Sequence, residues 1–260
     1  MKLDLPFYGC VPKLPDLNLA YRAELLGRAA SDAGLQRDLI YACKVDLLFW
    51  INSFCWLFEP RMERGRKKVV PFVTYPTLQD EPLIRMQRAL GVENMLIEKS
   101  RDTGGTWKVL HLFLHEWLFG EGDQFGVVSR DADAVDKTGD TGSLFWKLRF
   151  IIGKEKEGLG LPSWMMPSAF TSNKFTLLNE DNGCGILGYA ATGDVMRGDR
   201  KTAVLLDEFA AFPQGSDYDA LSSVQFVTNC VILMSTPDPK KGASGAFYDE
   251  ALKARLLSKR

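Results

Sequence analysis

A loop of eight residues, Lys99 to Thr106, has the residue types of a phosphate-binding site. It reads KSRDTGGT, follows the apolar segment 94–97 and precedes a helical pattern. Backbone N–H groups at a helix start can point at an anion, and the hydroxyl of Thr106 stands where it could ligate Mg²⁺. The usual pattern has lysine before the final Ser or Thr, and Gly105 occupies that place. Alone, the loop is a weak signal.

A second element is the acidic pair Asp207 and Glu208, which ends the apolar segment KTAVLL. We expect this segment to be a strand neighbouring the strand of the loop. Asp207 would then bind the coordination shell of a Mg²⁺ ion, usually through water. Glu208 would polarise the water that attacks a γ-phosphate. The alternative is an acidic helix start, since Asp and Glu favour that end of the helix dipole.

A third element is the segment CVILMSTPDP, in which a buried strand ends at Ser235 and Thr236 before Pro237. Hydroxyl groups at this edge of a sheet can sense a γ-phosphate and relay its presence through the following loop. A Ser/Thr turn before proline is also ordinary turn chemistry. The segment therefore indicates a nucleotide-binding site only in combination with the loop and the acidic pair.

These elements must be positioned by a sheet, and the apolar runs after Val69 indicate one. Five short runs are each followed by turn residues and a helical segment: VVPFVTY, NMLIEKS, QFGVVSR, KTAVLLDE and CVILMST. Such runs predict an α/β fold with a mostly parallel central sheet flanked by helices, whose sites lie at the carboxyl ends of the strands. The segment FTLLNEDNGCGILGYAATG instead predicts a β-hairpin around Asn182-Gly183.

Residues 1–60 form a different region, with the apolar spacing of two or three helices. They predict an N-terminal helical segment packed on a core of residues 61–260. Between the two lies the basic stretch EPRMERGRKK, residues 59–68. It is either a solvated loop or a nucleic-acid contact, and its charge alone does not decide between them.

The composition excludes several classes of protein. The formal charge of −1 rules out a uniformly basic chain, so any nucleic acid must bind at a local patch. The five cysteines are scattered and never spaced as CxxC, which argues against a disulfide framework or a zinc ribbon and predicts buried thiols in a reducing cytosol. Absence of a long apolar run predicts a soluble, unexported protein without membrane contact.

Taken together, these segments resemble the ATPase domain of the large terminase subunit of tailed bacteriophages, a DNA-packaging motor. The resemblance covers residues from Trp56 to the end. It rests on six segments and on the order in which they follow one another along the chain: WLFEPR, PFVTYPTLQDE, EKSRDTGGTW, VVSRDADAVDKTGDTGSLFWKLR, GDVMRGDRKTAVLLDE and ILMSTPDPKKGASGAFYDE. It implies a P-loop NTPase fold of the ASCE type.

The resemblance also implies roles for individual residues. Asp207 and Thr106 would hold Mg²⁺, Ser235 and Thr236 would couple hydrolysis to movement, and Gln79 would recognise adenine. The catalytic residues would be Glu208, Lys99, Arg101 and Arg197, where Arg197 acts as a finger on a neighbouring subunit and Arg200 competes for that role. The residues that bind the nucleotide would be Gln79, Lys99, Ser100, Arg101, Asp102, Thr103, Gly104, Gly105 and Thr106.

The loop departs from the family at its lysine. Some terminases carry this lysine at the start of the loop, and KSRDTGGT resembles that variant. Gly105 vacates the volume of the usual side chain, and the flexible stem of Lys99 can cross the loop to the β- and γ-phosphates. Arg101 and Lys108 compete for the role, and we expect Lys108 to point outward from its helix.

The function implied is Mg²⁺-dependent ATP hydrolysis that drives viral double-stranded DNA into a procapsid. The implied partners are the DNA, the portal protein, the small terminase subunit and other copies of the chain. The copies would form a pentameric ring when assembled, and the isolated chain would be a monomer. The implied location is the host cytoplasm, docked on the portal. Family members usually add a C-terminal nuclease domain, which this chain lacks, so it is either an excised ATPase domain or a protein whose nuclease lies elsewhere.

Two other functions remain open. A helicase-like DNA-dependent ATPase shares the glutamine, acidic and Ser/Thr motifs, but it needs a second ATP-gripping domain for which few residues follow Thr236. A nucleotide-binding assembly scaffold would bind ATP without turnover, and the presence of Glu208 argues against it.

Overall fold

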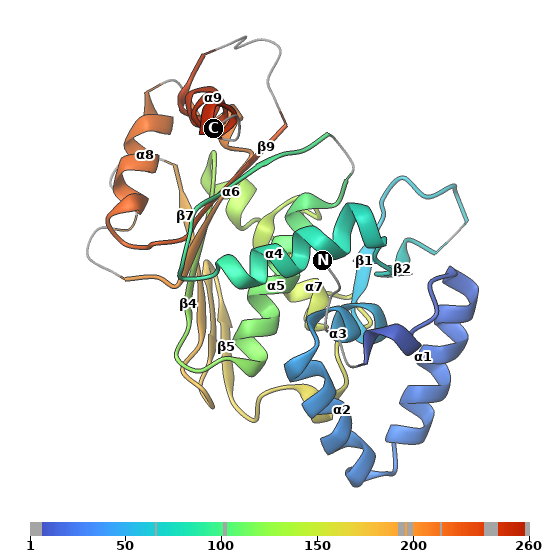
Figure 1. The fold of residues 1–260 in the computed structure, drawn as a ribbon. Helices are drawn as coiled ribbons and strands as arrows, with labels where there is room; N and C mark the ends of the chain where they lie inside the picture. Colours follow the sequence, from blue (N-terminus) through green and yellow to red (C-terminus); the bar gives the residue numbers. More distant parts are fainter. Residues whose placement is uncertain are drawn as a thin grey trace. The chain divides into compact units, whose positions relative to one another are not determined.

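The fold comes from a computed structural model that describes residues 7–65, 67–100, 103–191, 196, 200–213, 215–236 and 244–257. The chain forms two compact units (Figure 1). Unit 1 comprises Met1–Arg85 and Lys147–Ser168, and unit 2 comprises Met86–Trp146 and Ala169–Arg260. Each unit is described by itself.

Unit 1 is built from the N-terminal helices and a small sheet. The helices that the sequence predicts are present, and two of them begin at aspartates whose carboxylates accept backbone N–H groups: Asp32 from Leu35 and Asp46 from Phe49. The elements that lie wholly in this unit are η1 (Tyr8–Cys10), α1 (Pro15–Ala29), α2 (Ala33–Val45), α3 (Leu47–Phe54), β1 (Trp56–Phe58), β2 (Val69–Pro71), η2 (Pro76–Asp80) and η3 (Ser163–Met165).

The buried side chain of Arg22 ties α1 to the rest of unit 1. Its guanidinium donates to four backbone carbonyl groups, at distances from 2.7 to 3.4 Å: those of Ile51, Asn52, Cys55 and Phe72. The same group lies 4.8 Å from the ring centroid of Trp56. Burial lowers the pKa of Arg22 to about 10. The guanidinium therefore adds charged donors to the carbonyl groups of four buried residues.

Replacing Arg22 with methionine should destabilise the protein strongly. The change removes every hydrogen bond that the buried guanidinium donates to these carbonyl groups and to Asn18 Oδ1, and we expect a loss of about 3–5 kcal/mol in the free energy of unfolding. Urea unfolding followed by circular dichroism measures it. The matched control is Arg28→Met on the same helix, where the arginine is exposed and the change should stay within about 0.5 kcal/mol. Equal losses in the two variants would contradict this account.

Unit 2 contains a seven-stranded sheet of order β3-β9-β8-β4-β7-β6-β5. The five strands from β3 to β7 in this order are parallel, and β6 and β5 are antiparallel. The strands are β3 (Met95–Glu98), β4 (Gln124–Ser129), β5 (Phe170–Asn173), β6 (Thr176–Asn179), β7 (Gly185–Ala190), β8 (Ala203–Asp207) and β9 (Val231–Ser235). The predicted mostly parallel sheet is confirmed.

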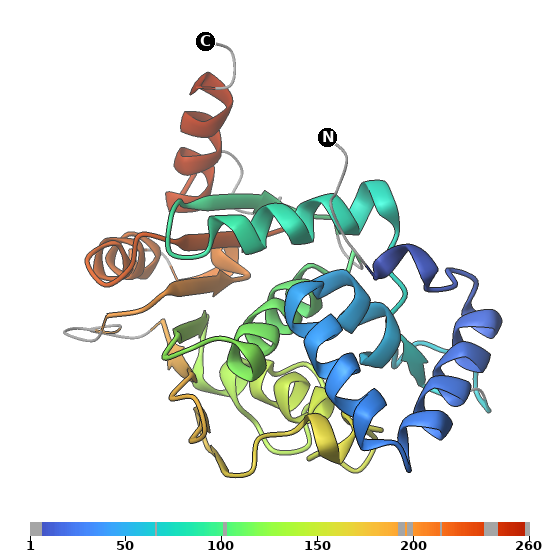
Figure 2. The ribbon, with the colours of Figure 1, turned by 60° about the horizontal axis from the view of Figure 1, so that its bottom comes forward.

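Helices cover both faces of this sheet. On one face, Val204 and Leu206 of β8 share a core with Leu221 of α8 and Phe247 of α9, and these two helices lie side by side in Figure 2. On the other face, the ring of Phe125 stacks on Phe113 of α5 at 4.5 Å. The helical elements are α5 (Gly105–Phe119), α6 (Ala132–Val135), η4 (Phe209–Ala211), α8 (Ser216–Gln225) and α9 (Ala246–Leu257), while α4 (Glu81–Ala89) and α7 (Leu144–Ile151) cross the boundaries of the units.

One strand prediction is wrong, one strand lies outside the predictions, and the predicted hairpin is confirmed. The run VVPFVTY is not in the large sheet, because β2 ends at Pro71 and pairs antiparallel with β1 in unit 1. A proline has no N–H to donate, so it does not suit a central strand. Strand β5 was not predicted. The hairpin around Asn182-Gly183 is present as the antiparallel pair β6 and β7.

All five cysteines lie within the described residues and are free thiols. Four are buried as predicted, whereas Cys10 is exposed, because the short helix η1 that carries it buries none of its residues. Among the described residues, none of the helices has both the length and the apolar character needed to cross a membrane.

Candidate nucleotide-binding site

The predicted phosphate loop connects β3 to α5 in unit 2. The backbone N–H of Lys99 donates to the carbonyl oxygen of Ser235 at 3.0 Å, which ties the start of the loop to β9. Gly104 has a φ of 67° and is the N-cap of α5, a left-handed conformation that glycine adopts without strain. The loop therefore ends directly at a helix N-terminus, as the sequence predicts.

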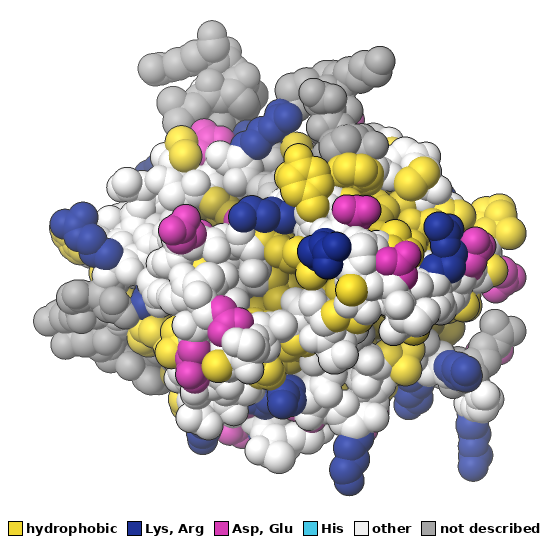
Figure 3. All heavy atoms as spheres, turned by 90° about the horizontal axis from the view of Figure 1, so that it is seen from below, with side chains coloured by type: hydrophobic (Ala, Val, Ile, Leu, Met, Phe, Trp, Pro, Cys, Tyr) yellow, Lys and Arg dark blue, Asp and Glu magenta, His cyan; other side chains and the backbone are white. Residues whose placement is uncertain are grey.

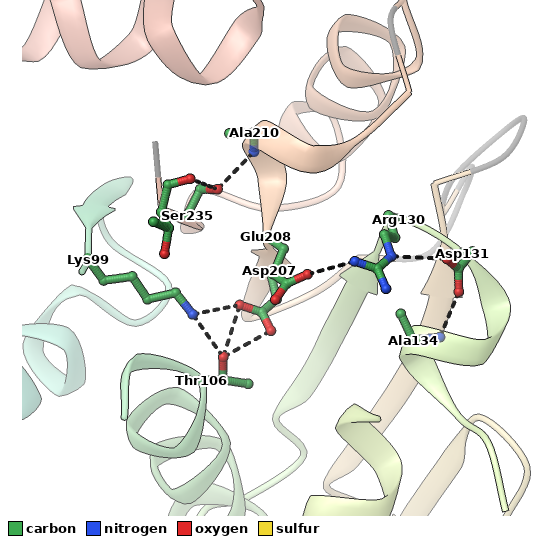
Figure 4. A network of polar contacts seen from close by, with 10 residues as sticks. Lys99, Thr106, Arg130, Asp131, Ala134, Asp207, Glu208, Ala210 and Ser235 are labelled. Carbon is green, nitrogen blue, oxygen red and sulfur yellow. Dashed lines mark hydrogen bonds and ion pairs between the residues drawn. The ribbon is translucent and has the colours of Figure 1, made fainter. Parts of the chain in front are cut away.

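Three polar side chains converge beside this helix N-terminus (Figure 4). The ammonium nitrogen of Lys99 donates to Thr106 Oγ1 at 3.1 Å and lies 3.6 Å from Asp207 Oδ1. Thr106 Oγ1 lies 3.1 Å and 3.0 Å from the two carboxylate oxygens of Asp207. The side chains of Lys99 and Asp207 are only 15% and 7% exposed. A cation, a hydroxyl and a carboxylate thus share one largely buried point at the edge of the sheet.

Gly105 leaves the space through which the Lys99 side chain passes. A Cβ atom on Gly105 would lie 2.7 Å from Lys99 Cδ and 2.8 Å from Met234 Sδ. Both distances are well below a van der Waals contact, so a larger residue would displace the lysine stem or the methionine. The lysine stem therefore passes through the space that the missing side chain of Gly105 leaves open.

Lys108 does not point outward as expected. Its side chain is buried on α5, and burial lowers its pKa, with a smaller contribution from the positive charge of Lys99. The reason for the error is that α5 is apolar on nearly all sides and is covered along most of its length, so it offers little exposed surface. Two lysines therefore lie near the same loop.

The strand of the acidic pair is not the direct neighbour of the loop strand. Strand β9 lies between them, paired in parallel with β3 on one side and with β8 on the other. Strands β8 and β9 are consecutive in the chain, and consecutive strands usually pair. Asp207 still reaches Thr106, because the carboxyl ends of the three parallel strands meet at one edge.

Glu208 points away from this cluster (Figure 4). Its carboxylate accepts a hydrogen bond from Arg130 Nη1 at 3.2 Å, and both side chains are 51% exposed. Arg130 follows β4 and also bonds Asp131, whose carboxylate caps α6. The backbone of Glu208 has a φ of 53°, which is costly for a residue with a side chain.

Sequence reasoning missed Arg130. The signal that could have found it is its place, since a basic residue directly after the apolar strand QFGVVS must lie at the same edge of the sheet as Asp207 and Glu208.

Ser235 links the loop to the turn that follows Glu208. Its carbonyl oxygen accepts from the backbone of Lys99, and its hydroxyl accepts from the backbone N–H of Ala210 at 3.1 Å. The hydroxyl in turn donates to the carbonyl of Thr236. One buried residue of β9 therefore contacts both segments that carry the candidate catalytic groups.

Three further predicted residues of unit 2 that the structure describes, Ser100, Thr103 and Arg200, make no polar contact with this cluster. Ser100 and Thr103 are exposed and bonded to each other, with Thr103 Oγ1 donating to the Ser100 carbonyl. Gln79 belongs to unit 1, where its side-chain oxygen accepts from the backbone of Tyr75. Arg200 is exposed. Arg101, Asp102, Arg197 and Pro237 lie outside the described residues.

No family model and no curated protein matches the chain. It is similar in structure to the large terminase of bacteriophage HK97, with a TM-score of 0.54 and 14% identity over 79% of this chain and 40% of that chain. The ATPase domain of the Thermus phage P74-26 large terminase gives a TM-score of 0.43 and 16% identity over 64% and 66% of the two chains. The chain thus spans less than half of the HK97 protein, and this likeness confirms the predicted α/β fold with a mostly parallel central sheet flanked by helices.

Proposed function

We propose that this chain is a Mg²⁺-dependent ATPase that drives viral double-stranded DNA into a procapsid, as the motor part of a large terminase. The observation that supports it most is the convergence of Lys99, Thr106 and Asp207 at the N-terminus of α5. An ammonium group, backbone N–H groups and a metal-binding pair are the parts that recognise a nucleoside triphosphate.

The donor set fits Mg²⁺. Thr106 and Asp207 supply one hydroxyl oxygen and one carboxylate. The described residues contain no cluster of three His, Cys, Asp or Glu side chains of the kind that holds other metal ions. Mg²⁺ commonly takes one or two protein oxygens and completes its octahedron with water and phosphate oxygens. When bound, Mg²⁺ neutralises charge on the phosphates and so assists the transfer.

Each of the other side chains has a role in this proposal. Lys99 places a positive charge against the β- and γ-phosphates, and its long stem lets the ammonium move from Asp207 to them. Glu208 accepts the proton of the attacking water. Ser235, with Thr236, transmits the change from the loop to the turn after Glu208, because its carbonyl and hydroxyl contact both segments.

Arg130 has the role of holding Glu208 back in the absence of nucleotide. The glutamate carboxylate must reach a water beside the γ-phosphate, and the ion pair with Arg130 directs it away from Thr106 and Asp207 (Figure 4). An exposed ion pair contributes only about 0–1 kcal/mol, so it can bias the position of Glu208 without fixing it.

Replacing Arg130 with methionine should raise ATP turnover in the absence of DNA. The ion pair between Arg130 and Glu208 contributes up to about 1 kcal/mol, so its loss should raise ATP turnover by at most about fivefold. A phosphate-release assay measures it. The matched control is Lys137→Met, which removes an exposed ion pair with Asp133 elsewhere in unit 2 and should leave turnover unchanged. A fall in turnover of Arg130→Met would show that the arginine assists catalysis instead.

The assembly belongs to the same proposal. In this proposal the isolated chain is a monomer, and assembled copies form a pentameric ring. The ring docks on the portal protein in the host cytoplasm and works with the small terminase subunit. Gln79 recognises adenine and Arg101 contacts the phosphates. Arg197, with Arg200 as competitor, reaches the nucleotide of the neighbouring subunit.

Steady-state phosphate release with and without duplex DNA tests the function. The proposal predicts Mg²⁺-dependent turnover that DNA stimulates. Binding of ATP without release of phosphate would favour a nucleotide-binding scaffold and would overturn the motor function.

A further inference from the structure

The hairpin of unit 1 carries a basic stretch whose described Arg and Lys side chains are all exposed. Strands β1 and β2 pair antiparallel, and residues 59–68 connect them. We call the strands and the described residues of this connection, 59–65, 67 and 68, the basic hairpin. Five of the ten connecting residues are Arg or Lys and two are Glu, although the whole chain has a formal charge of −1. Over the face seen in Figure 3, basic and acidic side chains are interspersed.

The positive charge of the hairpin is largely uncompensated. Glu59 is paired with Arg61, whose Nε lies 2.9 Å from its carboxylate. Arg64, Lys67 and Lys68 are exposed, and the described part of the chain provides no ion pair to any of the three. Free cations on one short connection create a local positive potential, which is the footprint of a polyanion site.

The hairpin is held at its base. The backbone N–H of Glu59 donates to the carbonyl oxygen of Lys68 at 2.8 Å. The first and last residues of the connection are therefore held together by a backbone hydrogen bond. On the β1 side, Trp56 lies under the buried guanidinium of Arg22, and Phe58 packs edge-to-face on Phe150 at 5.9 Å. A cation cluster on an anchored two-stranded ribbon loses less conformational entropy on binding than one on a free tail.

We propose that the basic hairpin is a contact for the phosphate backbone of double-stranded DNA, an inference that rests on the proposed function. Proteins that hold single strands stack bases on aromatic side chains, and residues 59–68 contain no aromatic residue. Long flexible cations without stacking partners bind phosphates irrespective of sequence. Such contacts suit a motor that must hold DNA of any sequence.

The test removes the three unpaired cations together. In the triple variant Arg64→Gln, Lys67→Gln, Lys68→Gln, the slope of log K against log salt for a mixed-sequence duplex should shrink by about 2.7, about 0.9 for each lost contact. Affinity at 0.1 M salt should fall more than about tenfold. Fluorescence anisotropy measures both quantities, and DNA-free ATP turnover of the same protein should not change.

Two matched controls separate this contact from general charge effects. The variant Arg64→Lys, Lys67→Arg, Lys68→Arg keeps every charge and should bind DNA as the natural protein does. The variant Arg28→Gln, Arg37→Gln, Lys44→Gln removes three exposed cations of α1 and α2 and should keep most of the affinity.

The outcomes distinguish the two proposals. An unchanged salt slope in the hairpin variant, with turnover intact, overturns the DNA contact alone, as does equal weakening in the helix control. A stronger effect on a single strand than on the duplex also overturns it. Failure of the natural protein to hydrolyse ATP overturns the proposed function instead.

Discussion

Replacing Lys99 with alanine should lower ATP turnover by at least about a hundredfold, the usual loss when a group that stabilises charge in the transition state is removed. Lys99 is the cation that lies beside Thr106 and Asp207. The measurement is steady-state phosphate release at saturating ATP and Mg²⁺, with circular dichroism to confirm folding.

Lys108 provides the matched control for this prediction, because it is a second buried lysine near the same loop. Lys108→Met keeps the volume of the side chain and should retain most of the turnover. The variant Gly105→Ala adds a Cβ where Lys99 Cδ and Met234 Sδ now lie, and it should reproduce much of the Lys99→Ala defect. Loss of activity in Lys108→Met with full activity in Lys99→Ala would assign the charge to Lys108.

Replacing Glu208 with glutamine should lower the hydrolysis step by about a hundredfold to ten-thousandfold, the range of a lost general base. The amide keeps the size of the side chain and can still accept a hydrogen bond from Arg130, but it cannot take a proton from water. Because Glu208 points away from the metal-binding pair, ATP should still bind. A single-turnover assay measures hydrolysis, and a fluorescent ATP analogue measures binding.

Asp207→Asn is the companion variant for Glu208→Gln. Asp207 contacts Thr106 and Lys99, so its loss should weaken Mg²⁺-dependent ATP binding as well as hydrolysis. Glu208→Gln with more than a tenth of normal turnover would mean that another group is the base.

Much of the fold follows from short local patterns. Strands β3, β4, β8 and β9 were each indicated by an apolar run that ends in a polar residue, because buried parallel strands need apolar side chains on both faces. The order of strands was less predictable. Nothing in residues 203–207 or 231–235 states that β9 inserts between β3 and β8, since that order depends on which edges remain open during packing.

The candidate site was predictable where its residues follow strands directly. Lys99, Asp207 and Ser235 were identified because each stands at a strand's carboxyl end, and the structure places them at one edge. Contacts that depend on side-chain direction were not predictable. Arg130 meets Glu208 where the backbone of Glu208 turns to the left-handed region, and Lys108 is buried by its surroundings rather than by its own polarity.

The backbone of Glu208 sets stability against activity at one residue. A left-handed conformation costs a residue with a side chain about 1–2 kcal/mol that glycine does not incur. Glycine at this position would therefore relax the backbone, but it would remove the carboxylate that the proposed function assigns to hydrolysis. In the proposed function, stability favours glycine at this position and hydrolysis favours glutamate.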